Sequence, residues 1–309
     1  MSCQLNISVI ITCYNCENFV SRAIDSVLNQ TLSPLEVILV NNNSTDNTVD
    51  VLKKYQLLHP NNIRVINETK QGAPAARNKG LYEARGGWIQ FLDADDELLP
   101  EKLESQYSIA EKSNSALVVS PYIIKGFRNN RPFEVTRSLE SDFWLGLIRS
   151  RLGITSANLW KRKYLLDVNG WDENLISSQE YDLMLRILQI HPVVAFDYKN
   201  LTIIHLLSSE SVSRGGGKMK GLQILESRIG LRLRIKDYLI SEDLLSTPRA
   251  YYLDRFVYKQ LYLHYRFYPD AVTKMLLKIN LRIKMYDRIV GNYFMFKMNL
   301  KKILKLDKV

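Results

Sequence analysis

Short apolar segments alternate with amphipathic segments along the N-terminal part of this chain. The apolar segments have strand length and many β-branched residues, whereas the segments between them place apolar side chains at helical spacing. This alternation predicts an α/β fold with a mostly parallel sheet flanked by helices. The expected strands are residues 7–12, 35–40, 63–66 and 88–92, and the expected helices are residues 19–28, 49–55 and 75–84.

Polar side chains follow three of these expected strands, at the point where each strand ends. The three polar segments are residues 12–15, 41–44 and 93–96. In parallel α/β sheets, ligands bind beyond the carboxyl ends of the strands. We therefore expect these side chains to gather at one edge of the sheet, where a nucleotide would bind.

The fourth expected strand ends in three carboxylates within four residues, namely Asp93, Asp95 and Asp96. Residues i and i+2 of a strand face the same side, so Asp93 and Asp95 can point toward one ion. Carboxylate oxygens suit Mg²⁺ or Mn²⁺, which usually also bind the phosphates of a substrate. The alternative is a solvated strand end, in which Asp95 or Asp96 caps a helix that begins at Pro100.

Composition indicates an ordinary globular protein. The chain has 309 residues, of which 46% are hydrophobic, and this is enough for a substantial core. The N-terminus lacks the basic and apolar regions of a signal peptide, and no window approaches about 18 uninterrupted apolar residues. The three cysteines, Cys3, Cys13 and Cys16, do not suit a disulfide framework. We expect a cytoplasmic protein that does not span a membrane.

Charge is distributed unevenly along the chain. Residues 215–309 contain 20 Lys/Arg and 8 Asp/Glu, whereas residues 1–214 contain 22 and 24. The three glycines at 215–217 supply a flexible joint between the two parts. We therefore expect one domain over residues 1–214, to which the family resemblance described below assigns catalysis, and a basic, aromatic-rich helical region over residues 215–309.

The basic region allows two interpretations. Helices with an apolar stripe, aromatic rings and a lysine-rich face suit an anionic membrane surface, which residues 251–309 would contact. Ordinary packing of these helices with a solvated basic face explains the same pattern. Nucleic acid is not an expected partner, because no nucleic-acid-binding motif is present and the front part is slightly acidic.

Several segments together resemble family 2 glycosyltransferases, in the order and spacing of that family. The resemblance covers about residues 5–214, and it implies a GT-A, Rossmann-like fold and an inverting enzyme that binds a nucleotide-sugar. The segments that carry it are Ser8-Val9-Ile10-Ile11-Thr12-Cys13-Tyr14-Asn15, Glu36-Val37-Ile38-Leu39-Val40 with Ser44-Thr45-Asp46-Asn47-Thr48, Ala76-Arg77-Asn78-Lys79-Gly80, and Phe91-Leu92-Asp93-Ala94-Asp95-Asp96.

The resemblance implies roles for individual residues on the donor side. Thr12 and Tyr14 match residues that line the nucleobase pocket, and Arg77 matches a basic residue near the base and the diphosphate. The residues alone favour the alternative that Arg77 is a surface arginine that pairs with Glu83 or with solvent. Asn42 lies where relatives usually place an aspartate that binds the base, so a uridine donor is expected but base selectivity is open.

The same resemblance assigns the metal. Asp95 matches the direct ligand of the metal on the diphosphate, and Asp93 matches a residue that contacts the ribose or a metal-bound water. His205, at the head of a serine-rich segment, matches a third ligand, although a lone histidine at a strand end is also an ordinary surface residue. The implied cofactor is Mn²⁺ or Mg²⁺. Residues 208–218 are suited to a lid over the bound donor.

Glu180 matches the general base of the family, in the segment from Ser178 to Arg186. Many relatives have aspartate at this position, so the Glu180 side chain reaches one methylene further. Asp182 is expected to cap the helix or to pair with Arg186 four residues later. Three tryptophans are candidates either for stacking on sugars or for the core: Trp144, Trp160 and Trp171.

The expected activity is metal-dependent, inverting transfer of one sugar from a nucleoside diphosphate donor, a UDP-sugar, to a saccharide acceptor. A lipid-linked acceptor would fit the basic C-terminal region, with the enzyme in the cytoplasm or peripherally on the inner face of the cell membrane. A nucleotidyltransferase is one alternative, but the segment at 12–15 lacks the glycine-rich loop that it needs. A non-catalytic membrane-binding relative is the other.

Overall fold

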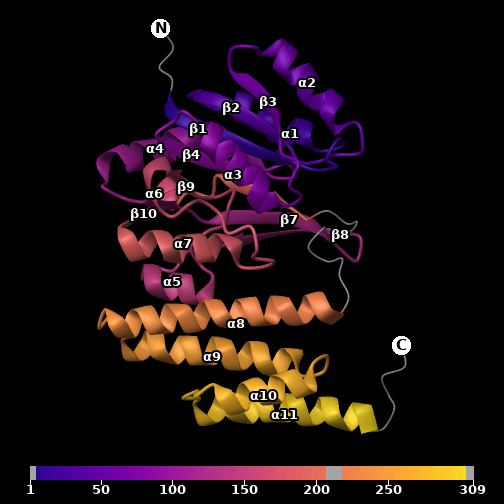
Figure 1. Cartoon of the computed structure of the whole chain (residues 1–309), viewed down its shortest axis with the longest axis vertical. Coiled ribbons are helices and arrows are strands. Elements are labelled where there is room, and N and C mark those ends of the chain that lie inside the picture. Colours follow the sequence, from indigo (N-terminus) through magenta and orange to yellow (C-terminus); the bar gives the residue numbers. More distant parts are fainter. Residues whose placement is uncertain (1–4, 207–217, 304–309) are drawn as a thin grey trace. The chain divides into compact units, whose positions relative to one another are not determined.

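The computed structural model describes residues 5–206 and 218–303, which form two compact units (Figure 1). Among these residues, the first unit comprises 5–143, 150–174 and 179–206, and the second comprises 144–149, 175–178 and 218–303. The expected boundary between residues 214 and 215 lies outside the described residues, so the assignment of domains to 1–214 and 215–309 stays a prediction.

A seven-stranded sheet forms the centre of the first unit, in the order β10-β6-β9-β4-β1-β2-β3. The pairs are parallel, except that β9 runs antiparallel to both of its neighbours. The mostly parallel sheet and the four expected strands are confirmed. The strands span β1 Leu5–Cys13, β2 Pro34–Asn41, β3 Ile63–Asn67, β4 Trp88–Asp93, β6 Leu117–Val119, β9 Leu159–Lys161 and β10 Val194–Phe196.

Helices pack on both faces of this sheet, because alternate side chains of each strand point to opposite faces. Ile7 and Val9 of β1 belong to a core cluster that also contains side chains of α1 and α4. Ile10 faces α3, where a Cβ on Gly80 would collide with the Cγ2 atom of Ile10, so glycine permits this close approach. The helices span α1 Val20–Leu28, α2 Thr48–Leu58, α3 Ala73–Glu83, α4 Lys102–Lys112, α6 Arg162–Asp167 and α7 Gln179–Ile190.

A smaller, four-stranded sheet has the order β5-β11-β7-β8. Its strands β7 and β8 form an antiparallel hairpin. The hairpin turns at Asn129 and Asn130, whose φ angles are 50° and 59°. Two consecutive residues with positive φ are typical of a type I′ turn, for which asparagine is a favoured residue. The strands span β5 Glu97–Leu98, β7 Tyr122–Arg128, β8 Arg131–Arg137 and β11 Thr202–His205.

The second unit is helical, as the fold prediction for the C-terminal region requires. Its central helix α9 contacts α8, α10 and α11. Leu225, Ile229, Val257, Leu261 and Val272 form a separate core cluster of this unit. In residues 5–206 and 218–303, no helix combines the length and the hydropathy that crossing a membrane requires. The helices span α5 Phe143–Arg149, of which Phe143 belongs to the first unit, α8 Lys218–Ser241, α9 Thr247–His264, α10 Pro269–Lys278 and α11 Met285–Ile303.

Candidate functional site

The carboxyl ends of β2, β1 and β4 lie side by side, as the sequence predicts. Thr12 of β1 pairs with Val40 of β2 on one side and with Asp93 of β4 on the other. The register therefore brings Thr12 next to the acidic strand end. Tyr14, just beyond β1, is 39% exposed, so its ring remains accessible to a ligand.

Arg77 of α3 reaches across to this strand end. Its NH2 atom donates a hydrogen bond to Asp93 Oδ1 at 2.7 Å, and its guanidinium lies 4.6 Å from the ring centroid of Trp171. The alternative interpretation of Arg77 is wrong, because the side chain is buried and Glu83 pairs with Lys79 instead. The Nε atom of Arg77 is buried and has no hydrogen-bond partner among the described residues.

The asparagines after β2 hold the segment between β3 and α3. Asn42 is buried, and its amide nitrogen donates to the carbonyl oxygens of Glu68 and Lys70 at 3.0 and 2.7 Å. Its amide oxygen accepts a hydrogen bond from Gly72 N at 2.7 Å. The predicted contact between Asn42 and a nucleobase stays a prediction, and a base would meet a side chain that already has a structural role.

The three carboxylates of the strand end lie close enough to perturb one another. Burial, and then the charge of Asp93, raises the pKa of Asp95. Burial, and then the charges of Asp93 and Asp95, raises the pKa of Asp96 well above its ordinary value. The capping alternative is wrong, because α4 begins at Lys102 and its N-cap residue is Glu101, without a side-chain cap.

The residues present fit a divalent cation that shares its ligands with a substrate. Arg77 pairs with Asp93, yet burial and the neighbouring carboxylates still raise the pKa of Asp95 and Asp96, so a further cation at Asp93 and Asp95 would favour their ionised forms. Within the described parts of the chain, no group of three or more His, Cys, Asp or Glu residues is arranged to hold a metal. Magnesium-type sites commonly use one or two carboxylates and complete their shell with phosphates and water. The donor set therefore suits a metal that arrives with a diphosphate.

Ser156, in the segment before β9, fixes the geometry of this strand end. Its hydroxyl donates a hydrogen bond to Asp96 Oδ2 at 2.5 Å and accepts one from the backbone N–H of Asp93 at 3.1 Å. Ser156 and Asp96 are both buried. One hydroxyl thus connects the two ends of the acidic turn, which places Asp95 between them.

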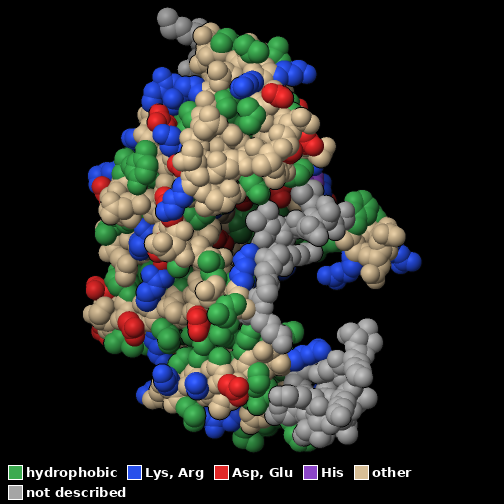
Figure 2. All heavy atoms as spheres, turned by 45° about the vertical axis from the view of Figure 1, so that its right-hand side comes forward, with side chains coloured by type: hydrophobic (Ala, Val, Ile, Leu, Met, Phe, Trp, Pro, Cys, Tyr) green, Lys and Arg blue, Asp and Glu red, His purple; other side chains and the backbone are tan. Residues whose placement is uncertain are grey.

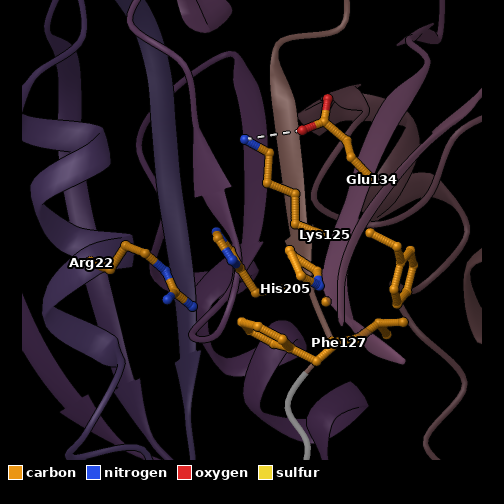
Figure 3. Close-up of a pocket in the computed structure, with 9 residues that line it drawn as sticks. Arg22, Lys125, Phe127, Glu134 and His205 are labelled. Atoms are coloured by element: carbon orange, nitrogen blue, oxygen red, sulfur yellow. Dashed lines mark ion pairs between the residues drawn. The ribbon is translucent and has the colours of Figure 1, made fainter. Parts of the chain in front are cut away.

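A cavity of about 570 Å³ is lined by Arg22 and His205, together with residues of β7 and β8 (Figure 3). Arg22 of α1 donates a hydrogen bond to the carbonyl oxygen of Asp95 at 2.6 Å. His205, at the end of β11, contacts Glu97 Oε2 through Nε2 at 3.0 Å, and its charge opposes the rise in the pKa of Asp95. Ligation of a metal by His205 stays a prediction. The proposed lid lies outside the described residues, apart from Lys218.

Glu180 is the second residue of α7. The charges of both Glu180 and the acidic strand end affect the pKa of the Tyr122 hydroxyl. Burial raises the pKa of Tyr122, the charge of Arg137 opposes this rise, and the charges of Glu180 and Asp96 add to it. Tyr122 therefore lies within electrostatic reach of both carboxylates. Asp182 has its predicted role, since its Oδ2 atom pairs with Arg186 Nε at 2.9 Å.

The three tryptophans belong to the protein interior. Trp144, Trp160 and Trp171 are at most 2% exposed, so the core interpretation is confirmed for each of them. Trp171 contributes to the site indirectly, since Arg77 stacks on its ring.

Sequence reasoning missed Arg22, Tyr122 and Ser156. No local pattern identifies Ser156, because its partners precede it by 60 and 63 residues. Tyr122 begins a hairpin that the Asn129-Asn130 dipeptide could have revealed. Arg22 could have been identified from the sequence, because it is a basic residue on the helix that follows β1. That helix begins at the end of the sheet that carries the site.

Comparisons with known proteins place the chain among glycosyltransferases. The family model described as "Glycosyl transferase family 2" matches residues 8–163. A chondroitin synthase of Escherichia coli is 29% identical over 192 residues, which are 60% of this chain and 27% of that protein. An uncharacterized glycosyltransferase of Methanocaldococcus jannaschii is 29% identical over 198 residues, which are 62% of this chain and 66% of that protein.

Solved structures resemble the fold. The crystal structure of S. aureus TarS 1-349 in complex with UDP-GlcNAc superposes with a TM-score of 0.63 at 20% identity, over 89% of this chain and 76% of that chain. The same protein in complex with UDP gives a TM-score of 0.60 over 89% of this chain and 75% of that chain.

Proposed function

This chain belongs to glycosyl transferase family 2 and has a GT-A fold, and from that premise we propose that it transfers one sugar from a UDP-sugar to a saccharide acceptor with inversion. The observation that carries this proposal is the arrangement at the end of β4. There a buried arginine with an unpartnered Nε pairs with Asp93, and burial and neighbouring charges raise the pKa of Asp95 and Asp96. A diphosphate with a divalent ion complements both features.

We propose that the donor binds along the strand ends. Thr12, Tyr14 and Asn42 would contact the nucleoside, while Arg77 would donate to the diphosphate and Asp93 would contact the ribose or the metal. The UDP and UDP-GlcNAc complexes of TarS support a uridine donor for this fold.

The proposed cofactor is Mn²⁺ or Mg²⁺, held by Asp95 and Asp93, with His205 as a further ligand. When bound, the ion offsets the negative charge that develops on the departing diphosphate. Arg77 would also stabilise the negative charge on the departing diphosphate, because its guanidinium is permanently ionised. Burial of the strand end strengthens these interactions by excluding water.

Glu180 is the proposed general base. The acceptor hydroxyl must lose its proton as it attacks the anomeric carbon from the side opposite the diphosphate, and a carboxylate at the start of α7 can accept that proton. Such a base typically contributes about 10²–10⁴ in rate. The charges of both Glu180 and Asp96 act on the pKa of Tyr122, which supports a short separation between the proposed base and the acidic strand end.

The proposed acceptor is a saccharide, free or lipid-linked, in the assembly of a surface polysaccharide. Chondroitin and hyaluronan synthases are among the similar proteins, and this chain spans 27% and 19% of their lengths. The basic helical unit supports an acceptor at an anionic membrane, on its inner face. The enzyme would then act at that surface from the cytoplasmic side.

Two substitutions separate donor binding from chemistry. Asp95→Ala should abolish the Mn²⁺-dependent part of UDP binding, measured by calorimetry. Glu180→Gln should retain UDP binding and lower the rate of UDP release from the donor in the presence of acceptor by about 10²–10⁴. Asp50→Asn, which also changes an acid in the first turn of a helix, is the control and should change neither measurement. Full transfer by Glu180→Gln would remove the proposed base.

A further inference from the structure

Helix α11 presents a row of large hydrophobic side chains to solvent. Met285, Tyr286, Ile289, Tyr293 and Phe296 are between 57% and 78% exposed. Residues four and three positions apart lie on one side of a helix, so Met285, Ile289, Tyr293 and Phe296 form a single stripe. We call Met285, Tyr286, Ile289, Tyr293 and Phe296 the α11 apolar face. Contiguous exposed apolar surface of this kind marks a site of interaction.

Contacts on the opposite side of α11 fix the direction of this face. Asp287 is buried and accepts hydrogen bonds from Arg255 Nε and from the Tyr251 hydroxyl of α9, both at 2.9 Å. A Cβ on Gly291 would lie 2.5 Å from the Tyr258 ring, so this glycine permits close packing of α11 on α9. If α11 turned its apolar face toward α9, the ion pair between Asp287 and Arg255 would break. Bulkier side chains would then occupy the place of Gly291 against Tyr258. The apolar face therefore points away from the unit's own core.

Basic side chains are frequent in the segment that carries the α11 apolar face. Residues 274–302 contain eight Lys/Arg and one acidic residue, Asp287, which faces α9. Figure 2 shows hydrophobic and basic side chains next to one another on the second unit. The basic side chains that the structure describes as exposed in this segment are Lys274, Lys278, Arg282, Lys284, Arg288 and Lys297.

We propose that the α11 apolar face docks on an anionic membrane surface. An interfacial helix inserts its apolar and aromatic side chains at the headgroup boundary, while flanking lysines and arginines contact acidic lipids. A second copy of the chain fits less well, because pairing two such faces would bring the positive charges of the two segments together. The inference rests on the proposed action at a membrane, but lipid binding tests it without any transfer.

The test uses the full chain and vesicles of two compositions. The wild type should sediment with vesicles of phosphatidylcholine and phosphatidylglycerol, but not with vesicles of phosphatidylcholine alone, and binding should weaken as salt rises. The double variant Ile289→Ser/Phe296→Ser should bind the anionic vesicles at least about tenfold more weakly, because two inserted apolar side chains are lost.

Leu57→Ser/Leu58→Ser is the matched control, since these α2 side chains are 80% and 63% exposed and lie in the first unit. This variant should bind vesicles as the wild type does. Unchanged binding by Ile289→Ser/Phe296→Ser overturns the proposal. The proposal is also overturned if the wild type does not bind vesicles and light scattering shows a wild-type dimer that Ile289→Ser/Phe296→Ser converts to a monomer. Vesicle binding by a chain that transfers no sugar would sink the proposed function and leave this inference intact.

Discussion

At the residue scale, the acidic strand end depends on a serine that precedes β9. Ser156 holds the carboxylate of Asp96 and the backbone N–H of Asp93 with one hydroxyl. The side chain itself is too buried to contact substrate, so Ser156 is a positioning residue. Its effect on the proposed site would be carried through Asp93 and Asp95.

Ser156→Ala should therefore weaken Mn²⁺-dependent UDP binding by about tenfold, because Asp96 and Asp93 N–H lose their common partner. Calorimetry with and without Mn²⁺ measures this change. Ser120→Ala is the control, since Ser120 is equally buried but donates to the carbonyl oxygen of Ala157. Each variant should lose about 1 kcal/mol of unfolding free energy. Equal donor affinities in the two variants would show that Ser156 has no role beyond stability.

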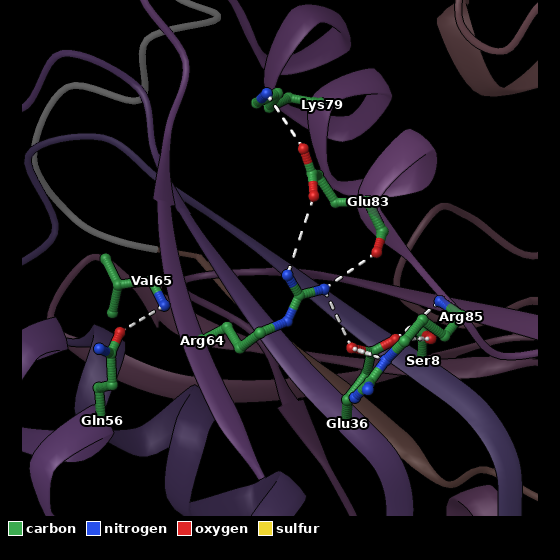
Figure 4. A network of polar contacts seen from close by, with 8 residues as sticks. All are labelled: Ser8, Glu36, Gln56, Arg64, Val65, Lys79, Glu83 and Arg85. Carbon is green, nitrogen blue, oxygen red and sulfur yellow. Dashed lines mark hydrogen bonds and ion pairs between the residues drawn. The ribbon is translucent and has the colours of Figure 1, made fainter. Parts of the chain in front are cut away.

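At the element scale, a single carboxylate joins β1, β2, β3 and the segment after α3 (Figure 4). Glu36 of β2 is buried and accepts hydrogen bonds from the Ser8 hydroxyl at 2.8 Å and from Arg85 N at 2.7 Å. Arg64 and Arg85 also pair with its second oxygen, each at 3.1 Å. Burial by itself would raise the pKa of Glu36, but these hydrogen bonds and charges outweigh burial and lower it.

Glu36→Gln should lower the free energy of unfolding at pH 7 by about 2 kcal/mol, because charged hydrogen bonds are lost in a buried place. Because the pKa of Glu36 is lowered in the folded state, its ionised carboxylate stabilises the fold at pH values above the ordinary pKa of glutamate. This stabilisation is lost as the pH falls through the pKa of Glu36 in the folded state. Urea unfolding from pH 7 to pH 3 should therefore show a smaller acid-induced loss in Glu36→Gln than in the wild type.

Glu83→Gln provides the comparison, because Glu83 pairs with Lys79 and Arg64 at the surface and its side chain is 41% exposed. Its effect on the free energy of unfolding should stay below about 1 kcal/mol. If both variants lose the same stability and show the same dependence on pH, Glu36 does not organise these strands.

At the scale of the whole molecule, the chain consists of two units with separate core clusters. The proposed donor site lies entirely within the first unit, and the α11 apolar face lies within the second. A ligand stabilises the cooperative unit that binds it. Donor binding and lipid binding are therefore expected to act on different units.

Calorimetric unfolding should show two transitions, and UDP with Mn²⁺ should raise the temperature of one of them. A ligand at a hundredfold excess over its Kd contributes about 2.7 kcal/mol, which corresponds to a shift of a few degrees for a unit of this size. Asp95→Ala should remove the shift and leave the other transition unchanged. One transition that moves as a whole would show that the two units unfold together.

The local pattern of the sequence was sufficient for the first part of the fold. The strands at β1 to β4 were predictable because each is a continuous apolar segment between polar turns, and parallel order brings their carboxyl ends to one edge. Thr12, Asp93 and Asp95 could be named for the same reason, whereas Arg77 of α3 was named only from the family resemblance, which also supplied the proposed roles. The small sheet was not predicted, because β11 pairs with β5 and β7 far away in the chain and the local β7-β8 hairpin was not recognised.

What the sequence by itself determined was the chemistry present at the strand ends and the amphipathic character of the C-terminal helices. The tertiary structure decided which groups meet: Arg77 with Asp93, Ser156 with Asp96, and Asp287 with Arg255. It also decided which side of α11 remains exposed. The physical reason is that periodicity records which residues share a face of one element, whereas contacts between elements depend on packing that no local pattern encodes.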